Sequence, residues 1–157
     1  MTTPSPQYAK AIGLCCLIAG TLDISDALIY SHFRGIAPTR ILQGIASGIL
    51  GRASFTQGTR SAVLGLFLHY FIATTVATIY IFASRRLPLS RHPFLWGSLY
   101  GILVYIVMNY IVFPLSKIGL RPTPPLPSLI NGVAALIFCI GIPIALIARR
   151  YIPCKIP

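Results

Sequence analysis

The chain of 157 residues is 55% apolar and only 10% charged, whereas soluble domains carry about a quarter charged residues. This balance excludes a soluble globular protein and identifies a membrane protein. Four membrane spans of about 20 residues, with the segments that join them, use up this length. We therefore predict a single transmembrane domain over residues 1–157.

The formal net charge of +11 would suggest a nucleic-acid partner in a soluble protein. Here the lysines and arginines lie at the ends of apolar runs, as Lys10, Arg60 and Arg149 illustrate. Cations in such positions reach the phosphate headgroups of lipids and fix the orientation of the spans. The predicted partner is therefore the lipid bilayer, and we expect no nucleic acid.

Four apolar runs are long enough to cross the bilayer as helices. They cover, approximately, residues 11–30, 60–84, 94–113 and 128–148. We expect residues 1–9 to be a short frayed tail, and we expect the proline-rich link that ends at Pro127 to be extended. The predicted fold is all-α, an integral membrane four-helix bundle with one additional short helix.

The additional helix is predicted over residues 39–52, where Ile41, Leu42, Ile45 and Ile49 form one apolar stripe. A helix of this length reaches about 21 Å, which is less than the roughly 30 Å of hydrocarbon in a bilayer. We therefore expect an interfacial or re-entrant helix. We favour a connector on the membrane surface; the alternative is a wall over the acidic residues described below.

Small residues recur at helical spacing in the second and third spans, at Gly65, Ala73, Ala77, Gly97 and Gly101. Such faces let two helices approach closely. They serve contacts within one bundle or contacts between copies of the chain. We favour packing within one bundle, so an oligomer is the less favoured interpretation.

The distribution of basic residues gives the orientation of the four spans. Seven lie on the side of the termini, at Lys10, Arg85, Arg86, Arg91, Arg149, Arg150 and Lys155. Six lie on the other side, at Arg34, Arg40, Arg52, Arg60, Lys117 and Arg121. Because the first group is clustered in short segments close to span ends, we predict that both termini are cytoplasmic.

Asp23 and Asp26 are the only acidic residues in the chain, and both lie in the first apolar run. An ionisable side chain inside a membrane span costs about 2.5 to 3.5 kcal/mol, so it usually faces a partner or a water-filled cavity. On a helix, residues three apart lie on one face. The two carboxylates are therefore expected to share one site.

Other polar residues are expected at a similar depth. His69 lies as many residues from its membrane face as Asp23 does, so the two side chains could meet. The predicted intramembrane cluster comprises Asp23, Asp26, His69, Asn109 and Asn131. Arg34 and Arg40 are the candidate charge partners of the carboxylates.

Three interpretations of this cluster are open. It locks the helices together, or it is a protonatable site through which the protein moves or senses a proton, a small cation or a small solute. The third interpretation is a metal site of two aspartates and one histidine, which lacks a fourth strong ligand. We predict no cofactor and no metal.

An enzyme is the less favoured class, because the sequence contains no HExxH, GxSxG, P-loop or CxxC motif. A substrate cavity that reaches His69 would favour catalysis. His32 and His92 lie at the membrane edges, where a loop or headgroup role is the ordinary explanation.

Residues 97–101 (GSLYG) and 109–115 (NYIVFPL), with the proline-rich link and the histidine of the second span, resemble the small uncharacterised bacterial inner-membrane proteins of the YagU type. The resemblance covers roughly the latter two thirds of the chain. The link between the first and second spans is shorter here than in that group. The resemblance implies a bacterial inner-membrane protein with several helices, and it implies no activity or site residues.

Overall fold

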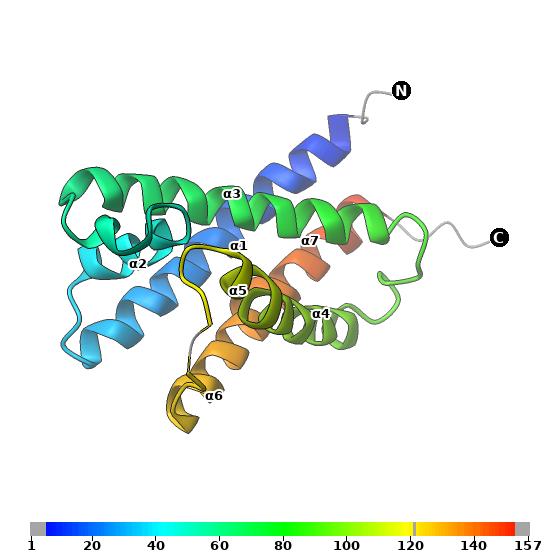
Figure 1. Cartoon of the computed structure of the whole chain (residues 1–157). Helices are drawn as coiled ribbons and strands as arrows, with labels where there is room; N and C mark the ends of the chain where they lie inside the picture. The colour runs from blue at the N-terminus through cyan, green and yellow to red at the C-terminus, as the bar shows by residue number, and fades with distance from the viewer. Residues whose placement is uncertain (1–5, 121, 153–157) are drawn as a thin grey trace.

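The computed structural model describes residues 6–120 and 122–152, and all of the regular structure in them is helical (Figure 1). Two of the long helices are continuous, α1 (Pro6–Phe33) and α3 (Thr59–Ala83). The third helical run comprises α4 (Pro93–Val107), a π-helical turn (Met108–Val112) and α5 (Phe113–Leu115). The fourth comprises α6 (Leu126–Ala135), a π-helical turn (Leu136–Gly141) and α7 (Ile142–Tyr151).

These four runs are long and apolar enough to cross a membrane, with candidate spans at Gln7–Phe33, Thr59–Ala83, Pro93–Leu115 and Leu126–Tyr151. The predicted all-α four-helix architecture is confirmed, and the chain is a multi-pass membrane protein. Arg121 and Lys155, which entered the charge count, lie outside the described residues, as do the first five residues of the predicted tail.

The structure corrects the predicted ends of the helices. Helix α1 begins at Pro6, inside the predicted tail, and ends at Phe33 instead of near residue 30. Leu126 and Pro127 belong to the first turn of α6 and not to the extended link. The first turn of a helix tolerates proline because the missing N–H has no partner within the helix at that position.

Glycines bring the third and fourth spans together. A Cβ atom placed on Gly97 would lie 2.9 Å from the carbonyl oxygen of Gly141, and one on Gly101 would lie 2.7 Å from the Cα atom of Ile137. Distances this short leave room for hydrogen only, so the two backbones are in direct contact. The predicted small-residue face of the third span is thus used within one chain.

The packed core lies toward the end of the bundle where α1 begins and α7 ends. Ala11 and Cys15 of α1 meet Ile81 of α3 and Ile144 and Ala148 of α7 there, all nearly or fully buried. The side chains that α1 contributes to this core are small, which lets the helices approach closely. The opposite half of the bundle is built differently, because a further helix takes part in it.

That further helix is α2 (Pro38–Leu50), which continues into a 3₁₀ turn (Gly51–Phe55). Its 13 residues reach only about 20 Å, which is less than the roughly 30 Å of hydrocarbon in a bilayer. Figure 1 shows α2 beside the first turns of α3. The backbones touch where the Leu42 carbonyl fills the space that a side chain on Gly65 would need, and the backbone N–H of Lys117 donates to the Gly48 carbonyl at 2.9 Å.

Candidate functional site

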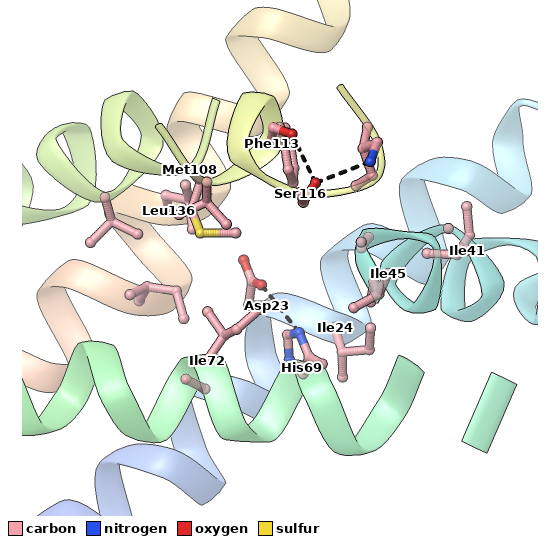
Figure 2. Close-up of a pocket in the computed structure, with 18 of the residues that line it drawn as sticks. Asp23, Ile24, Ile41, Ile45, His69, Ile72, Met108, Phe113, Ser116 and Leu136 are labelled. Atoms are coloured by element: carbon pink, nitrogen blue, oxygen red, sulfur yellow. Dashed lines mark hydrogen bonds and ion pairs between the residues drawn. The ribbon is translucent and has the colours of Figure 1, made fainter. Parts of the chain in front are cut away.

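A cavity of about 560 Å³ lies between α2 and the four spans (Figure 2). Its walls come from α1, α2, α3, the third span with the loop after α5, and the π-helical turn of the fourth span. Most of the lining is aliphatic, and its charged or titratable side chains are Asp23, His69 and Arg40. Helix α2 therefore forms one wall of a cavity that contains an acidic residue, which is the second of the two roles considered for it.

Asp23 and His69 face each other across the contact between α1 and α3. Oδ2 of Asp23 lies 4.0 Å from Nδ1 of His69, and the two side chains are 23% and 11% exposed, respectively. Figure 2 shows the Asp23 carboxylate pointing into the cavity above the His69 ring. The sequence prediction that these two residues could meet is matched by the geometry.

The other nitrogen of the His69 ring determines the protonation pattern of the pair. Nε2 lies 2.8 Å from the carbonyl oxygen of Gly20, one helical turn before Asp23 on α1. A carbonyl oxygen can only accept a hydrogen bond, so Nε2 must carry hydrogen and act as the donor. In neutral histidine this leaves Nδ1 as a bare acceptor, directed at the carboxylate.

A bare Nδ1 and an ionised carboxylate are both acceptors and repel each other. The arrangement is favourable when one more proton is present, either as a histidinium facing a carboxylate or as a neutral histidine accepting from a carboxylic acid. At 4.0 Å the two groups do not share a hydrogen bond, and a positive charge between or on them would relieve their repulsion.

Asp26 and Asn131 form a second polar contact. Nδ2 of Asn131 donates to Oδ2 of Asp26 at 3.1 Å, which joins α1 to α6. Asp23 lines the cavity and Asp26 does not, although the two are close enough to interact electrostatically. Two carboxylates three residues apart thus have different partners.

Asn109 is not brought to the pair. Its side-chain Nδ2 donates to the backbone carbonyl of Tyr105 at 2.9 Å, four residues back on the same span. This bond joins the π-helical turn, which contains Asn109, to the end of α4, which contains Tyr105. Of the five polar residues in the predicted cluster, the structure therefore makes two pairs and leaves the fifth bonded to its own helix.

Neither candidate charge partner forms an ion pair with an aspartate in the part of the chain that the structure describes. Nη1 of Arg34 donates to Oγ of Ser128 at 2.9 Å. The guanidinium of Arg40 lies over the Phe55 ring, 4.6 Å from its centroid, while the side chain lines the cavity. Both arginines are exposed, so their charges remain accessible to water or headgroups.

The described residues contain no group of three or more His, Cys, Asp or Glu side chains placed to hold a metal ion. The cavity does reach His69, the feature that would favour catalysis. The hydroxyl in its lining belongs to Ser116, which donates to the Phe113 carbonyl at 2.8 Å and accepts from the Ile118 N–H at 3.2 Å. A hydroxyl committed in this way is not paired with His69 as a nucleophile with its base.

Sequence reasoning missed Gly20 and Ser128. Gly20 accepts the His69 hydrogen bond through its backbone carbonyl, a group that every residue has and that the sequence therefore does not single out. Gly20 also allows close packing, because a Cβ atom there would lie 3.0 Å from the Tyr70 ring. Ser128 was predicted only as the start of the fourth span, yet its hydroxyl bonds both Arg34 and Tyr30. A glycine one turn before an intramembrane aspartate was the available signal for the first of these.

Comparison of the chain with protein-family models, with curated proteins and with solved structures finds no match. The resemblance to proteins of the YagU type stays a prediction. The function is therefore argued from the site alone.

Proposed function

We propose that this multi-pass protein carries out proton-linked or cation-linked transport or sensing in the bacterial inner membrane. The observation that carries the proposal is the hydrogen bond from His69 to the Gly20 carbonyl, which leaves Nδ1 facing the Asp23 carboxylate. A proton taken up by such a pair relieves the repulsion between the two acceptors, and the pair can release that proton again. Histidine is the side chain suited to this near neutral pH.

Access supports the same function. The pair lines a cavity and is not sealed in packed side chains, and about a quarter of the Asp23 side chain is exposed. An intramembrane carboxylate that only joined helices would gain nothing from an open space beside it, because its ionised form is costly there. Charged groups around the pair are Asp26 on α1 and Arg40 on α2, with the Cys139 thiol close on the fourth span.

The second candidate function is structural. The His69–Gly20 bond joins α3 to α1, and the Asn131–Asp26 bond joins α6 to α1. Interhelical hydrogen bonds of this kind contribute about 0.6 kcal/mol on average in a membrane protein. In this case the polar residues hold the bundle together and no flux exists.

Reconstitution separates the two functions. Wild-type protein, Asp23→Asn and His69→Ala are placed in liposomes under a pH gradient, and proton flux is followed with a pH-sensitive dye inside the vesicles. Asp26→Asn is the matched control, because it removes the other carboxylate on the same helix face but not the one in the cavity. We expect flux in wild type and Asp26→Asn and its loss in the other two variants.

Flux equal to that of empty liposomes, in both gradient directions and with Na⁺ or K⁺ present, would leave the structural function in place. Loss of flux in Asp26→Asn to the same extent as in Asp23→Asn would show that proton flux does not depend on the position of Asp23 in the cavity.

We further propose that both termini are cytoplasmic and that the chain acts as a single bundle. Single cysteines replacing Ala53, in the turn after α2, and Ser90, in the loop before α4, are labelled with a membrane-impermeant maleimide in a background without native cysteines. We expect the Ala53 position to be labelled from outside the cell and the Ser90 position only after lysis. Labelling of both from one side would mean that α2 crosses the bilayer. A stable dimer in mild detergent would contradict the single bundle.

A further inference from the structure

The cavity is much larger than a proton or a metal ion requires. Its volume of about 560 Å³ falls in the range of about 300 to 1,000 Å³ that is typical of sites for small organic molecules. Its walls are mostly aliphatic side chains, such as Ile41 and Ile45 of α2, Ile72 of α3 and Met108 of the third span. An occupant of this space has an apolar body.

The polar group of the occupant follows from the Asp23–His69 pair. Once a proton has left the pair, the cavity presents a carboxylate oxygen and a bare ring nitrogen, both of which are acceptors. A neutral hydrogen-bond donor would leave the carboxylate charge uncompensated, whereas a positive charge takes the place of the proton and neutralises it. A small hydrated cation would exchange its water shell for aliphatic walls, which is unfavourable, whereas a cation with an apolar body buries that body against them.

Resting on the proposed function, we infer that the cavity binds a lipophilic organic monocation in exchange for the proton of the Asp23–His69 pair. The exchange balances in charge and in protons. The protonated pair loses one proton to the solvent, the cation enters beside the ionised carboxylate, and His69 is left neutral with its Nε2–H on the Gly20 carbonyl. The net charge of the cavity is unchanged.

The remaining groups around the pair are compatible with this exchange. The Arg40 guanidinium is exposed and stacked over the Phe55 ring, so its repulsion of a cation beside Asp23 is reduced by solvent. Tyr70 is engaged with Thr21, with 3.0 Å between their hydroxyl oxygens. The third span contributes no charged side chain to the lining.

The test uses two probes of one shape and opposite charge, the tetraphenylphosphonium cation and the tetraphenylborate anion. Each is titrated calorimetrically into the purified full-length protein in detergent, in two buffers with different ionisation enthalpies, which gives the affinity and the number of protons released. We expect saturable binding of the cation with release of up to one proton, and no saturable binding of the anion.

Three variants locate the site, and each is first checked for folding by its thermal midpoint and its elution volume. Asp23→Asn should weaken cation binding by about 30-fold or more and abolish proton release, because it removes the charge partner of the cation. Asp26→Asn should bind within about threefold of wild type. Gly44→Leu should block binding sterically with the pair intact, since Gly44 lines the cavity and has no atom within 4 Å of an added Cβ.

The inference is overturned if the cation binds wild type and Asp23→Asn equally, if the anion binds as tightly as the cation, or if neither probe binds. The proposed function has its own readout in the proton flux of liposomes without probe. Flux that depends on Asp23 and His69 without cation binding would therefore refute the ligand class and leave the proposed function standing. Absence of both would refute both.

Discussion

Replacing Gly65 by alanine tests how α2 is held against the bundle. The added Cβ atom would overlap the backbone carbonyl of Leu42, which has no rotamer through which to move away. Carbon and oxygen atoms in contact need more than 3 Å, so the two helix backbones must separate by about 1 Å. Overpacking of this kind costs about 1 to 3 kcal/mol.

Gly13→Ala is the matched control. Gly13 lies in α1, and no atom lies within 4 Å of an added Cβ. Both substitutions gain about 1 kcal/mol of helix propensity, so the difference between them isolates the clash. For a chain of this size, 1 kcal/mol corresponds to about 2 to 4 °C in the thermal midpoint. We expect Gly65→Ala to unfold several degrees below Gly13→Ala in the same detergent.

A second assay detects the alternative that α2 lifts away while the spans stay folded. Ala46 is fully buried on α2, so a cysteine in its place should be protected from a maleimide reagent. In a background without native cysteines, Gly65→Ala should increase the labelling rate of Ala46→Cys, and Gly13→Ala should not. Wild-type stability together with wild-type protection in Gly65→Ala would refute the close contact between α2 and α3.

Two further predictions concern polar groups in the spans. Tyr100→Phe should lower the free energy of unfolding by about 0.5 to 1.5 kcal/mol, because it removes a hydroxyl that donates to the Val76 carbonyl at 2.7 Å. Tyr80→Phe should be neutral or stabilising, because the buried Tyr80 hydroxyl has no hydrogen-bond partner among the described residues. Equal losses in thermal unfolding would contradict this. A double-mutant cycle of Asp26→Ala with Asn131→Ala should give a coupling energy of about 0.5 to 1.5 kcal/mol, and additive losses would contradict the bond between the two side chains.

The positions of the four spans could be predicted because bilayer thickness fixes the length of an apolar helix. The pairing of Asp23 with His69 could be predicted by counting depth, since both lie equally far from one membrane face. The hydrogen bond of Asn109 could not be predicted in this way, because depth does not tell in which direction around the helix a side chain points. Its amide turns back to the Tyr105 carbonyl instead of crossing to the pair.

The helix ends and widened turns were not predictable from apolarity. The third span continues past Pro114 to Leu115, where we expected it to end near residue 113. A proline inside a helix has no backbone N–H to donate a hydrogen bond, and its ring crowds the carbonyl four residues back. The π-helical turn Met108–Val112 precedes Pro114 and Leu136–Gly141 precedes Pro143, so each proline follows a stretch whose hydrogen-bond pattern is already loosened.

The cavity follows from the difference between the two halves of the bundle. Where α1 begins and α7 ends, small residues such as Ala11 and Ala148 let the helices close on one another and leave a packed core. In the other half, α2 packs its backbone onto α3 at Gly65 and its end onto the loop at Lys117. Its aliphatic face therefore meets the spans across open space. Asp23 lies on the wall of that space, whereas Asp26, one turn further along α1, accepts a hydrogen bond from Asn131. The proposed exchange of charge rests on this arrangement, in which the Asp23 carboxylate lies beside an open apolar space with the His69 ring 4.0 Å away.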